Sequence, residues 1–556
     1  MGGRARSAPT QRHPLLIRRD RVRTESTGAA HRRARLDSHR LAASRCKRAV
    51  TDGRIAVAMG GAGTDAAAAF GLDDADMEGS GGPPAALQSH LDGFGQGHVT
   101  EYWSELSASE RRALCDQIAG IDFGAVRTAF DDAVADASKT SEGPSAPPAP
   151  VDGAQVCAFD SLDGATRDDL YRQGLGLIAH GKVGVILLAG GQGTRLGTSL
   201  PKGCVDIGLP SHKGLFQIQA ERILRLQSLA AREAFGEGAT PRHPIRWYVM
   251  LSAATREYTK TFFQEHACFG LSPDQIVFFE QGRLPCLSPA GAALMATAGR
   301  IAESPDGNGG IYKALAVSGC IADMRLHGVD YVDCYSVDNL LVKIADPFFV
   351  GYCHSRQVDL GCRALAKAYP EEKVGVFVKR GDGIGVVEYS ELDPAVSSSV
   401  DASGALVYNW SNICMQYYAT NFLERICGPD VRMTHHLATK DIPTVKGKER
   451  GVKLEKFIFD VFPEAKRTCL VEVKREEEFA PVKNAFGAER DSPDTARRAL
   501  MALHRRWAQA AGVPVTGAGD EGIEISPLVS YGGEGLRALQ KSASLEANTE
   551  ITTLPK

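Results

Sequence analysis

Three glycines, an arginine and a Pro-Lys pair follow a short apolar run at residues 183–203, which read VGVILLAGGQGTRLGTSLPKG. Glycines at 190, 191 and 193 allow backbone N–H groups to converge on an anion. Arg195 and Lys202 add two cations within reach of the same loop, and Pro201 restricts the backbone just before the lysine. This combination of amides and cations predicts a phosphate-binding loop.

Two other phosphate-binding patterns fit this loop poorly. The dinucleotide pattern G-x-G-x-x-G requires Gly or Ala where Leu196 stands, and the P-loop pattern G-x-x-x-x-G-K-[ST] is absent. Glycines at a strand exit can also serve geometry alone. The prediction therefore depends on the presence of Arg195 and Lys202 beside them.

The elements that must position this loop alternate between strands and helices. The run before the loop is too short and too continuous for an amphipathic helix, so it predicts a strand buried on both faces. Further strands are predicted at 246–253 and 331–339, an amphipathic helix at 215–230, and a hairpin at 375–392. This alternation predicts an α/β fold with a doubly wound, mostly parallel sheet that binds ligands at the carboxyl ends of its strands.

Composition and periodicity divide the chain into four parts. Residues 1–85 are a disordered basic and Ala/Gly-rich extension, and residues 86–180 are a helical segment with a Pro-rich linker. Residues 181–470 form a catalytic domain, and residues 471–556 form a small C-terminal domain. The extension offers few apolar residues for a core. In the helical segment, Ser107-x-x-Glu110 predicts a capping box at a helix start.

Charge and cysteine content limit the function classes. The 556 residues carry a net charge of −3, which gives no bulk attraction to nucleic acid or anionic membrane. No apolar run approaches the ~18 residues that a membrane helix needs. The thirteen cysteines, an odd number without a C-x-x-C pair, predict reduced thiols.

The first fifty residues are strongly basic, with 14 Lys and Arg against three acidic residues. This Arg- and Ser-rich opening resembles a transit peptide. A solvated basic tail and an upstream start site are the alternatives, and we expect a cytoplasmic protein.

The loop and several further blocks resemble eukaryotic UDP-N-acetylhexosamine pyrophosphorylases. LLAGGQGTRLG…PKG and GLPSHKGLFQIQAERI carry the resemblance, and blocks such as YSVDNLLVKIADPFFVG, WSNICM and GVKLEKFIFDVFP follow in the family's order across residues 90–540. The resemblance implies a Rossmann-like nucleotidyltransferase domain between an N-terminal helical segment and a small C-terminal β-rich domain. It implies synthesis of UDP-GlcNAc, or UDP-GalNAc, and diphosphate from UTP and the sugar 1-phosphate, with Mg²⁺ or Mn²⁺. The expected protein is a monomer or homodimer with small-molecule partners and no nucleic acid or membrane.

The resemblance also assigns the site residues by position. The UTP site would be Leu188, Ala189, Gly190, Gly191, Gly193, Lys202, Gln281, Gly307, Asp338 and Lys453, with Gln281 and Gly307 at positions that recognise uracil. The sugar site would be Asn308, Gly375, Glu388, Asn412, Phe457, Phe459 and Lys483. Arg195, Lys202 and Lys453 would be the catalytic cations, with Asp338 as the metal ligand. A helix N-cap is the alternative for Asp338, and core packing is the alternative for the two phenylalanines.

Two features leave the substrate open. Ser411 stands where animal and fungal members have glycine, in a plant-type context, and could alter the preference between GlcNAc and GalNAc. The pair His435-His436 has no partners at metal-ligand spacing, so we expect it to be structural or solvent-facing. The rival functions are a UDP-glucose or broad UDP-sugar pyrophosphorylase and a catalytically dead nucleotide-sugar-binding paralogue.

Overall fold

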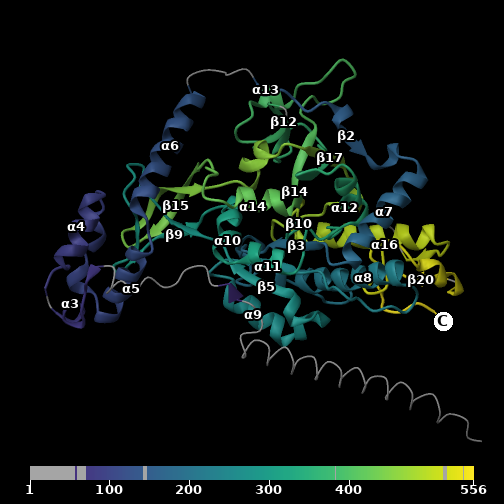
Figure 1. Cartoon of the computed structure of the whole chain (residues 1–556), viewed down its shortest axis with the longest axis horizontal. Helices are drawn as coiled ribbons and strands as arrows, with labels where there is room; N and C mark the ends of the chain where they lie inside the picture. Colours follow the sequence, from purple (N-terminus) through teal and green to yellow (C-terminus); the bar gives the residue numbers. More distant parts are fainter. Residues whose placement is uncertain are drawn as a thin grey trace, which may run out of the picture.

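The computed structural model describes residues 57–58, 70–79, 81–141, 147–381, 383–517, 522–542 and 544–555. Its centre is an 11-stranded sheet (Figure 1). The main path of this sheet runs through β1 (Val57–Ala58), β5 (Ile276–Glu280), β4 (Trp247–Leu251), β3 (Val183–Leu188), β10 (Tyr331–Ser336), β14 (Trp410–Ala419), β11 (Leu360–Ala366), β17 (Thr468–Glu472) and β2 (Val156–Ala158). All neighbours on the path are parallel except β14, which is antiparallel to β10 and β11. The predicted mixed, mostly parallel α/β fold is confirmed.

Every residue of β3 is buried, as the continuous apolar run predicts. Its side chains alternate between two cores: Val185 and Leu187 face one side of the sheet, and Ile186 and Leu188 face the other. The first core is completed by helices α7 (Gly164–Ala179), α8 (Leu215–Phe235), α9 (Arg256–Glu265) and α12 (Pro347–Ser355). The second is completed by α10 (Ile311–Val317), α11 (Cys320–Leu326) and α14 (Thr420–Ile426).

Two hairpins extend this frame. The predicted one is formed by β12 (Val376–Arg380) and β13 (Gly383–Val387), and it joins β14 through Val376 and Ser411. The other is formed by β15 (His436–Thr444) and β16 (Gly447–Glu455).

The N-terminal helices pack against the second hairpin (Figure 1). They are α3 (Asp74–Glu78), α4 (Ala85–Gly93), α5 (Ala108–Ala119) and α6 (Phe123–Ser141). The predicted capping box is present, with Ser107 accepting from the Glu110 amide at the start of α5. Leu72 and Met77, which were expected in a disordered extension, are buried in the same core as Val452 and Leu454 of β16.

The other predicted domain boundaries also differ from those in the structure. Residues 57–58 add a strand to the edge of the sheet, whereas the rest of 1–69 lies outside the described residues. Strand β2 and helix α7 already belong to the central domain, so this domain begins before residue 181.

The C-terminal part contains less strand than the resemblance implies. Its longest element is the 18-residue helix α16 (Pro493–Ala510), and beyond this helix its described strands are the two-residue β18 (Val515–Thr516), β19 (Glu524–Ile525), β20 (Leu545–Glu546) and β21 (Glu550–Ile551). None of the helices in the described part of the chain has the length and apolar character that a membrane crossing needs.

Helices α7 and α12 cross at two glycines that permit backbone contact. A Cβ atom at Gly174 would overlap the carbonyl oxygen of Pro347, and one at Gly351 would overlap the carbonyl oxygen of Leu170. Because both obstacles are backbone atoms, neither can move aside as a side chain would.

We expect Gly174→Ala to lower the free energy of unfolding by about 1–3 kcal/mol through overpacking at this crossing. Gly176→Ala, in the same helix with open space around it, is the matched control and should raise stability by up to about 1 kcal/mol. Urea unfolding of both variants measures the difference. Equal effects of the two substitutions would contradict the proposed crossing.

Candidate active site

A cavity of about 540 Å³ opens at the carboxyl ends of the parallel strands. Strands β3 and β10 are neighbours with Leu188 beside Ser336, so the loops that follow them leave the sheet side by side. The cavity brings together the predicted residues Leu188, Gly190, Gly191, Gln281, Gly307, Asn308, Asp338, Gly375, Glu388, Asn412 and Lys483. This is where ligands bind in open parallel sheets.

The loop after β3 is closed by its own backbone. The Gly193 amide donates to Leu200 O at 2.9 Å, and the Lys202 amide donates to Gly191 O at 3.3 Å. Gly193 therefore shapes the loop and does not offer its amide to a ligand. The amides of Gly190, Gly191 and Gln192 donate to no acceptor in the described part of the chain, which leaves a group of three adjacent amides for an anion.

Lys202 extends from this loop toward the carboxylate that follows β10. Its Nζ lies 3.9 Å from Asp338 Oδ2 and donates to Val482 O at 3.2 Å. Burial lowers the pKa of Lys202; Asp338 opposes this shift, whereas Arg195 and Lys483 add to it by repulsion. Lys202 thus pairs with Asp338 and lies close enough to Arg195 and Lys483 to be repelled by them, an arrangement that a polyanion would stabilise.

Asp338 does not cap a helix. The next helix after β10 is α12, and its N-cap is Asp346. Asn339 is also occupied, since its Nδ2 donates to Glu478 O and its Oδ1 accepts from the Ala480 amide. The N-cap alternative is therefore excluded, and the Asp338 carboxylate faces the cavity with Lys202 as its ion-pair partner.

The predicted uracil end is built by close backbone contacts. A Cβ atom at Gly190 would lie 2.6 Å from Gln281 Oε1, so glycine allows that amide to approach the loop. Gly307 has φ +87°, a backbone conformation that favours glycine, and a Cβ atom there would also overlap Lys456 O. Both the backbone conformation and the lack of space therefore require glycine at this position. Asn308, which the resemblance assigns to the sugar site, follows directly, and its Oδ1 accepts from the Ile458 amide at 2.9 Å.

The predicted sugar end is built around a β-bulge in β14. Register with β11 shifts between Cys362 and Ala364, and Cys414 adopts φ +56° on the opposite strand. This bulge turns Asn412, Ile413 and Cys414 toward the cavity. Ser411 is fully buried and does not line the cavity, so any influence of Ser411 on the sugar is indirect.

Several assigned residues lie outside the cavity wall: Ala189, Gly193, Arg195, Lys202, Lys453, Phe457 and Phe459. Phe459 is buried in the core and Phe457 packs against that core, with ring centroids 5.0 Å apart. Lys453 lies on the β15–β16 hairpin opposite Ala438. Lys202 nevertheless reaches the cavity residue Asp338.

The sequence interpretation missed several residues of the wall, among them Lys373, Tyr389, Cys414 and Phe479. Tyr389 directly follows Glu388, and Cys414 and Phe479 stand in the same blocks as Asn412 and Lys483, so proximity was the available signal. Lys373 stands two residues before the predicted residue Gly375, so the same signal applied to it.

His436, the first residue of β15, connects the second hairpin to residues near the predicted sugar site. Its ring lies between Asp460 Oδ1, at 3.1 Å, and Glu391 Oε1, at 3.5 Å, and stacks on Phe457 with centroids 4.2 Å apart. Glu391 in turn accepts from the Glu388 amide. Hydrogen bonds to both carboxylates outweigh burial and raise the pKa of His436 to about 9. These contacts with Asp460, Glu391 and Phe457 give His436 a structural role.

The chain is similar to known proteins over most of its length. Residues 129–535 match the family model described as UTP–glucose-1-phosphate uridylyltransferase. UDP-N-acetylglucosamine diphosphorylase 2 of Arabidopsis thaliana is 46% identical over 483 residues, covering 84% of this chain and 94% of that protein. The UDP-N-acetylglucosamine pyrophosphorylase of Saccharomyces cerevisiae is 38% identical over 468 residues, covering 80% and 94%. A solved uridine diphosphate N-acetylglucosamine pyrophosphorylase from Trypanosoma brucei superposes with a TM-score of 0.73 at 31% identity, covering 85% and 96%.

The charged state of His436 predicts a pH-dependent stability. Because its folded pKa of about 9 exceeds its ordinary value of 6.5, its contribution is complete below pH 6.5 and is lost as the pH rises through 9. In the wild type we expect the free energy of unfolding to fall by about 2 kcal/mol between these pH values, and we expect His436→Gln to abolish this fall. His435→Gln is the control. Burial lowers the pKa of His435 to about 4, so this substitution should change the pH dependence of stability only below pH 6.5. Denaturant unfolding from pH 5 to 9.5 checks this, and parallel profiles for wild type and His436→Gln would contradict it.

Proposed function

The chain belongs to the UTP–glucose-1-phosphate uridylyltransferase family, and we propose that it transfers a uridylyl group from UTP to N-acetylglucosamine 1-phosphate, forming UDP-N-acetylglucosamine and diphosphate. Its relatives in plants and yeast are UDP-N-acetylglucosamine pyrophosphorylases. The observation that carries the proposal is one cavity lined by Gln281 and Gly307, which the resemblance assigns to uracil, and by Glu388 and Asn412, which it assigns to the sugar. Gly190 and Gly191, whose amides are free, and Lys483 line the same cavity.

The reaction suits these residues because it requires little proton transfer. A sugar-phosphate oxygen attacks the α-phosphorus of UTP, a new P–O bond forms, and the bond to the leaving diphosphate breaks. The attacking oxygen is already anionic near neutral pH, so no general base is needed. The protein must align two polyanions and stabilise the charge that develops on diphosphate. The amides of Gly190 to Gln192 and the ammonium of Lys202 are suited to this task.

The residues present fit a divalent metal that arrives with the nucleotide. Mg²⁺ is commonly bound by one or two carboxylates together with substrate phosphates and waters. Asp338 offers one carboxylate at the cavity, and no cluster in the described part of the chain would hold the ion by protein ligands alone. We infer that Asp338 holds Mg²⁺ or Mn²⁺ beside the phosphates, where the ion would neutralise phosphate charge.

Two rival functions would require different features of the site. A UDP-glucose pyrophosphorylase would share the loop but would need no N-acetyl pocket. A catalytically dead paralogue would be expected to have lost a phosphate cation or the metal carboxylate, yet Arg195, Lys202, Asp338 and Lys453 are all present.

Substrate choice is tested by measuring diphosphate release from UTP with the 1-phosphates of GlcNAc, GalNAc and glucose. We expect kcat/KM for GlcNAc 1-phosphate to exceed that for glucose 1-phosphate by at least tenfold, because only the former carries an N-acetyl group that the sugar site could recognise. A preference for glucose 1-phosphate would favour the first rival. Absence of turnover with all three would favour the second.

Lys202→Ala should lower kcat by about 10²–10³, because it removes a charge-stabilising contact from the reacting phosphates. Lys440→Ala, an exposed lysine on β15, is the matched control and should leave kcat unchanged. Steady-state kinetics with UTP and GlcNAc 1-phosphate compare the two variants. Wild-type turnover by Lys202→Ala would remove this lysine from the mechanism.

A further inference from the structure

Gln416 is a fully buried polar residue of β14 that does not line the candidate active site. The residues opposite it are Cys334 on β10 and Cys362 on β11, and both belong to the apolar core on that face of the sheet. Its Oε1 atom is buried and has no hydrogen-bond donor among the described residues. A buried amide group without a partner costs free energy, so an apolar side chain would suit this position better unless the glutamine serves another purpose.

The other end of the Gln416 amide contacts a residue of the active site. Asn412 lies at the bulge of β14 and lines the cavity. Gln416 Nε2 donates to Asn412 Oδ1 at 3.2 Å, and the backbone amide of Cys414 donates to the same oxygen at 3.2 Å. The side-chain oxygen of Asn412 is therefore occupied by two donors from its own strand.

These two contacts fix the polarity of the Asn412 amide group. A backbone N–H can only donate, so the Asn412 atom that faces Cys414 must be the oxygen. That oxygen can only accept, so the Gln416 atom that faces it must be the nitrogen. Asn412 Nδ2 is the end of the amide that remains, and it has no acceptor in the described part of the chain. Asn412 is thus set to act as a donor to a ligand in the cavity.

The strand opposite the bulge is anchored on the other face of the sheet. Arg363 lies on β11 at the point where register with β14 shifts. Its side chain is fully buried, with Nη1 3.0 Å from Glu478 and Nη2 3.7 Å from Asp333, and its guanidinium stacks over Phe349 at 4.7 Å. Phe349 belongs to the first core, whereas the cysteines opposite Gln416 belong to the second. The bulge therefore lies between a charged anchor on one face and Gln416 on the other.

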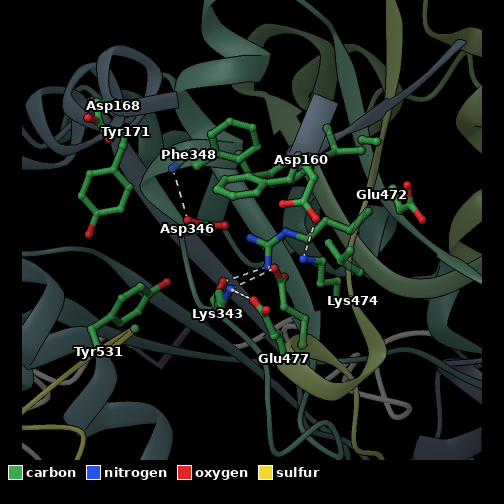
Figure 2. A pocket seen from close by; sticks show the side chains of 18 of the residues that line it. Asp160, Asp168, Tyr171, Lys343, Asp346, Phe348, Glu472, Lys474, Glu477 and Tyr531 are labelled. Carbon is green, nitrogen blue, oxygen red and sulfur yellow. Dashed lines mark hydrogen bonds and ion pairs between the residues drawn. The ribbon is translucent and has the colours of Figure 1, made fainter. Parts of the chain in front are cut away.

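This anchor belongs to a second cavity, of about 600 Å³, which shares no lining residue with the active site (Figure 2). Its charged floor consists of Arg363, Lys343 and Glu478, and the Lys343 ammonium lies 3.3 Å from the Glu478 carboxylate. Asp346, the N-cap of α12, lines the same cavity (Figure 2). Gln416 lines neither cavity, so a substitution there changes the setting of the active-site asparagine without removing a residue from either wall.

We propose that Gln416 is a positioning residue for the sugar substrate, because it holds Asn412 with Nδ2 toward the cavity, where this nitrogen donates to an acceptor oxygen of the sugar 1-phosphate. This inference rests on the sugar assignment of Asn412 in the proposed function. The acceptor is a hydroxyl oxygen or, in an N-acetyl sugar, the carbonyl oxygen of the acetamido group. Without Gln416, Asn412 Oδ1 keeps only the Cys414 amide as a donor, and the side chain can turn this oxygen toward the cavity, where it would repel such an acceptor.

The experiment measures how much the sugar adds to nucleotide binding. Calorimetry with the full chain and Mg²⁺ gives the affinities for UDP-GlcNAc and for UDP. Gln416→Met keeps the length of the side chain and removes its donor. We expect it to weaken UDP-GlcNAc binding about three- to tenfold and to change UDP binding less than about twofold. Tyr417→Phe is the matched control, since this neighbour on β14 lies in the other core and its buried hydroxyl has no partner among the described residues, and both affinities should stay within about twofold.

A double-mutant cycle distinguishes positioning from a general loss of structure. If Gln416 acts through Asn412, then Asn412→Ala weakens UDP-GlcNAc binding by itself, and the addition of Gln416→Met weakens it no further. The proposal is overturned if the two losses add, if Gln416→Met weakens UDP and UDP-GlcNAc equally, or if Gln416→Met binds UDP-GlcNAc as the wild type does.

Asn412→Asp tests the polarity directly and serves even if Gln416→Met does not fold. It keeps the oxygen that both donors hold and replaces only Nδ2, the atom that faces the cavity, by an acceptor. We expect it to weaken UDP-GlcNAc binding at least about tenfold more than UDP binding. Equal effects on the two ligands would refute the donor role of Asn412 and the positioning role of Gln416 with it.

Failure of the proposed function has a different signature, because it is seen in the wild type. Absence of turnover with every sugar 1-phosphate would contradict catalysis, yet the binding comparison would still test Gln416. Wild-type protein that binds UDP-GlcNAc no more tightly than UDP would contradict the sugar assignment of Asn412, and the role of Gln416 would fall with it.

Discussion

The parallel pairing of β3 with β10 is the constraint on which the candidate active site depends. It sets Leu188 beside Ser336, so the amide-rich loop and Asp338 leave the sheet at neighbouring positions. Both strands are buried in a sheet covered on its two faces by helices, which makes their register expensive to change. The loop then closes on itself through Gly193 and Lys202. The phosphate recognition that we propose for this loop thus depends on strand register.

Local pattern was sufficient to predict the elements nearest the chemistry. A continuous apolar run with glycines after it indicates a buried parallel strand and a close backbone approach to a ligand. The buried parallel strand is confirmed at β3, and the loop after it keeps three amides free. The capping box at Ser107 was equally local, because its two hydrogen bonds involve residues three positions apart. The resemblance to a family placed distant positions such as Gln281 and Asn412 in one site, which periodicity alone could not do.

What the sequence left unpredicted arises from contacts between distant segments. The bulge at Cys414 depends on register with β11, and the place of β2 depends on pairing with β17, more than 300 residues later. Leu72 and Met77 stand in a weakly apolar stretch, yet they are buried because α5 and the β15–β16 hairpin cover them. The charge cluster of Arg363 was equally hidden, since its partners come from β10, the segment before α12 and the segment after β17.

The segment from Glu477 to Lys483 contributes to both cavities. Glu478 takes part in the charged floor of one, whereas Phe479, Pro481 and Lys483 line the other. Asn339 holds it through Glu478 O and the Ala480 amide, and the Val482 amide donates to Asp338 O. Most irregular surface segments accept insertions and deletions readily. An insertion or deletion of a single residue in the segment from Glu477 to Lys483 would displace Lys483 relative to Asp338. We therefore expect natural length variation to fall outside this segment.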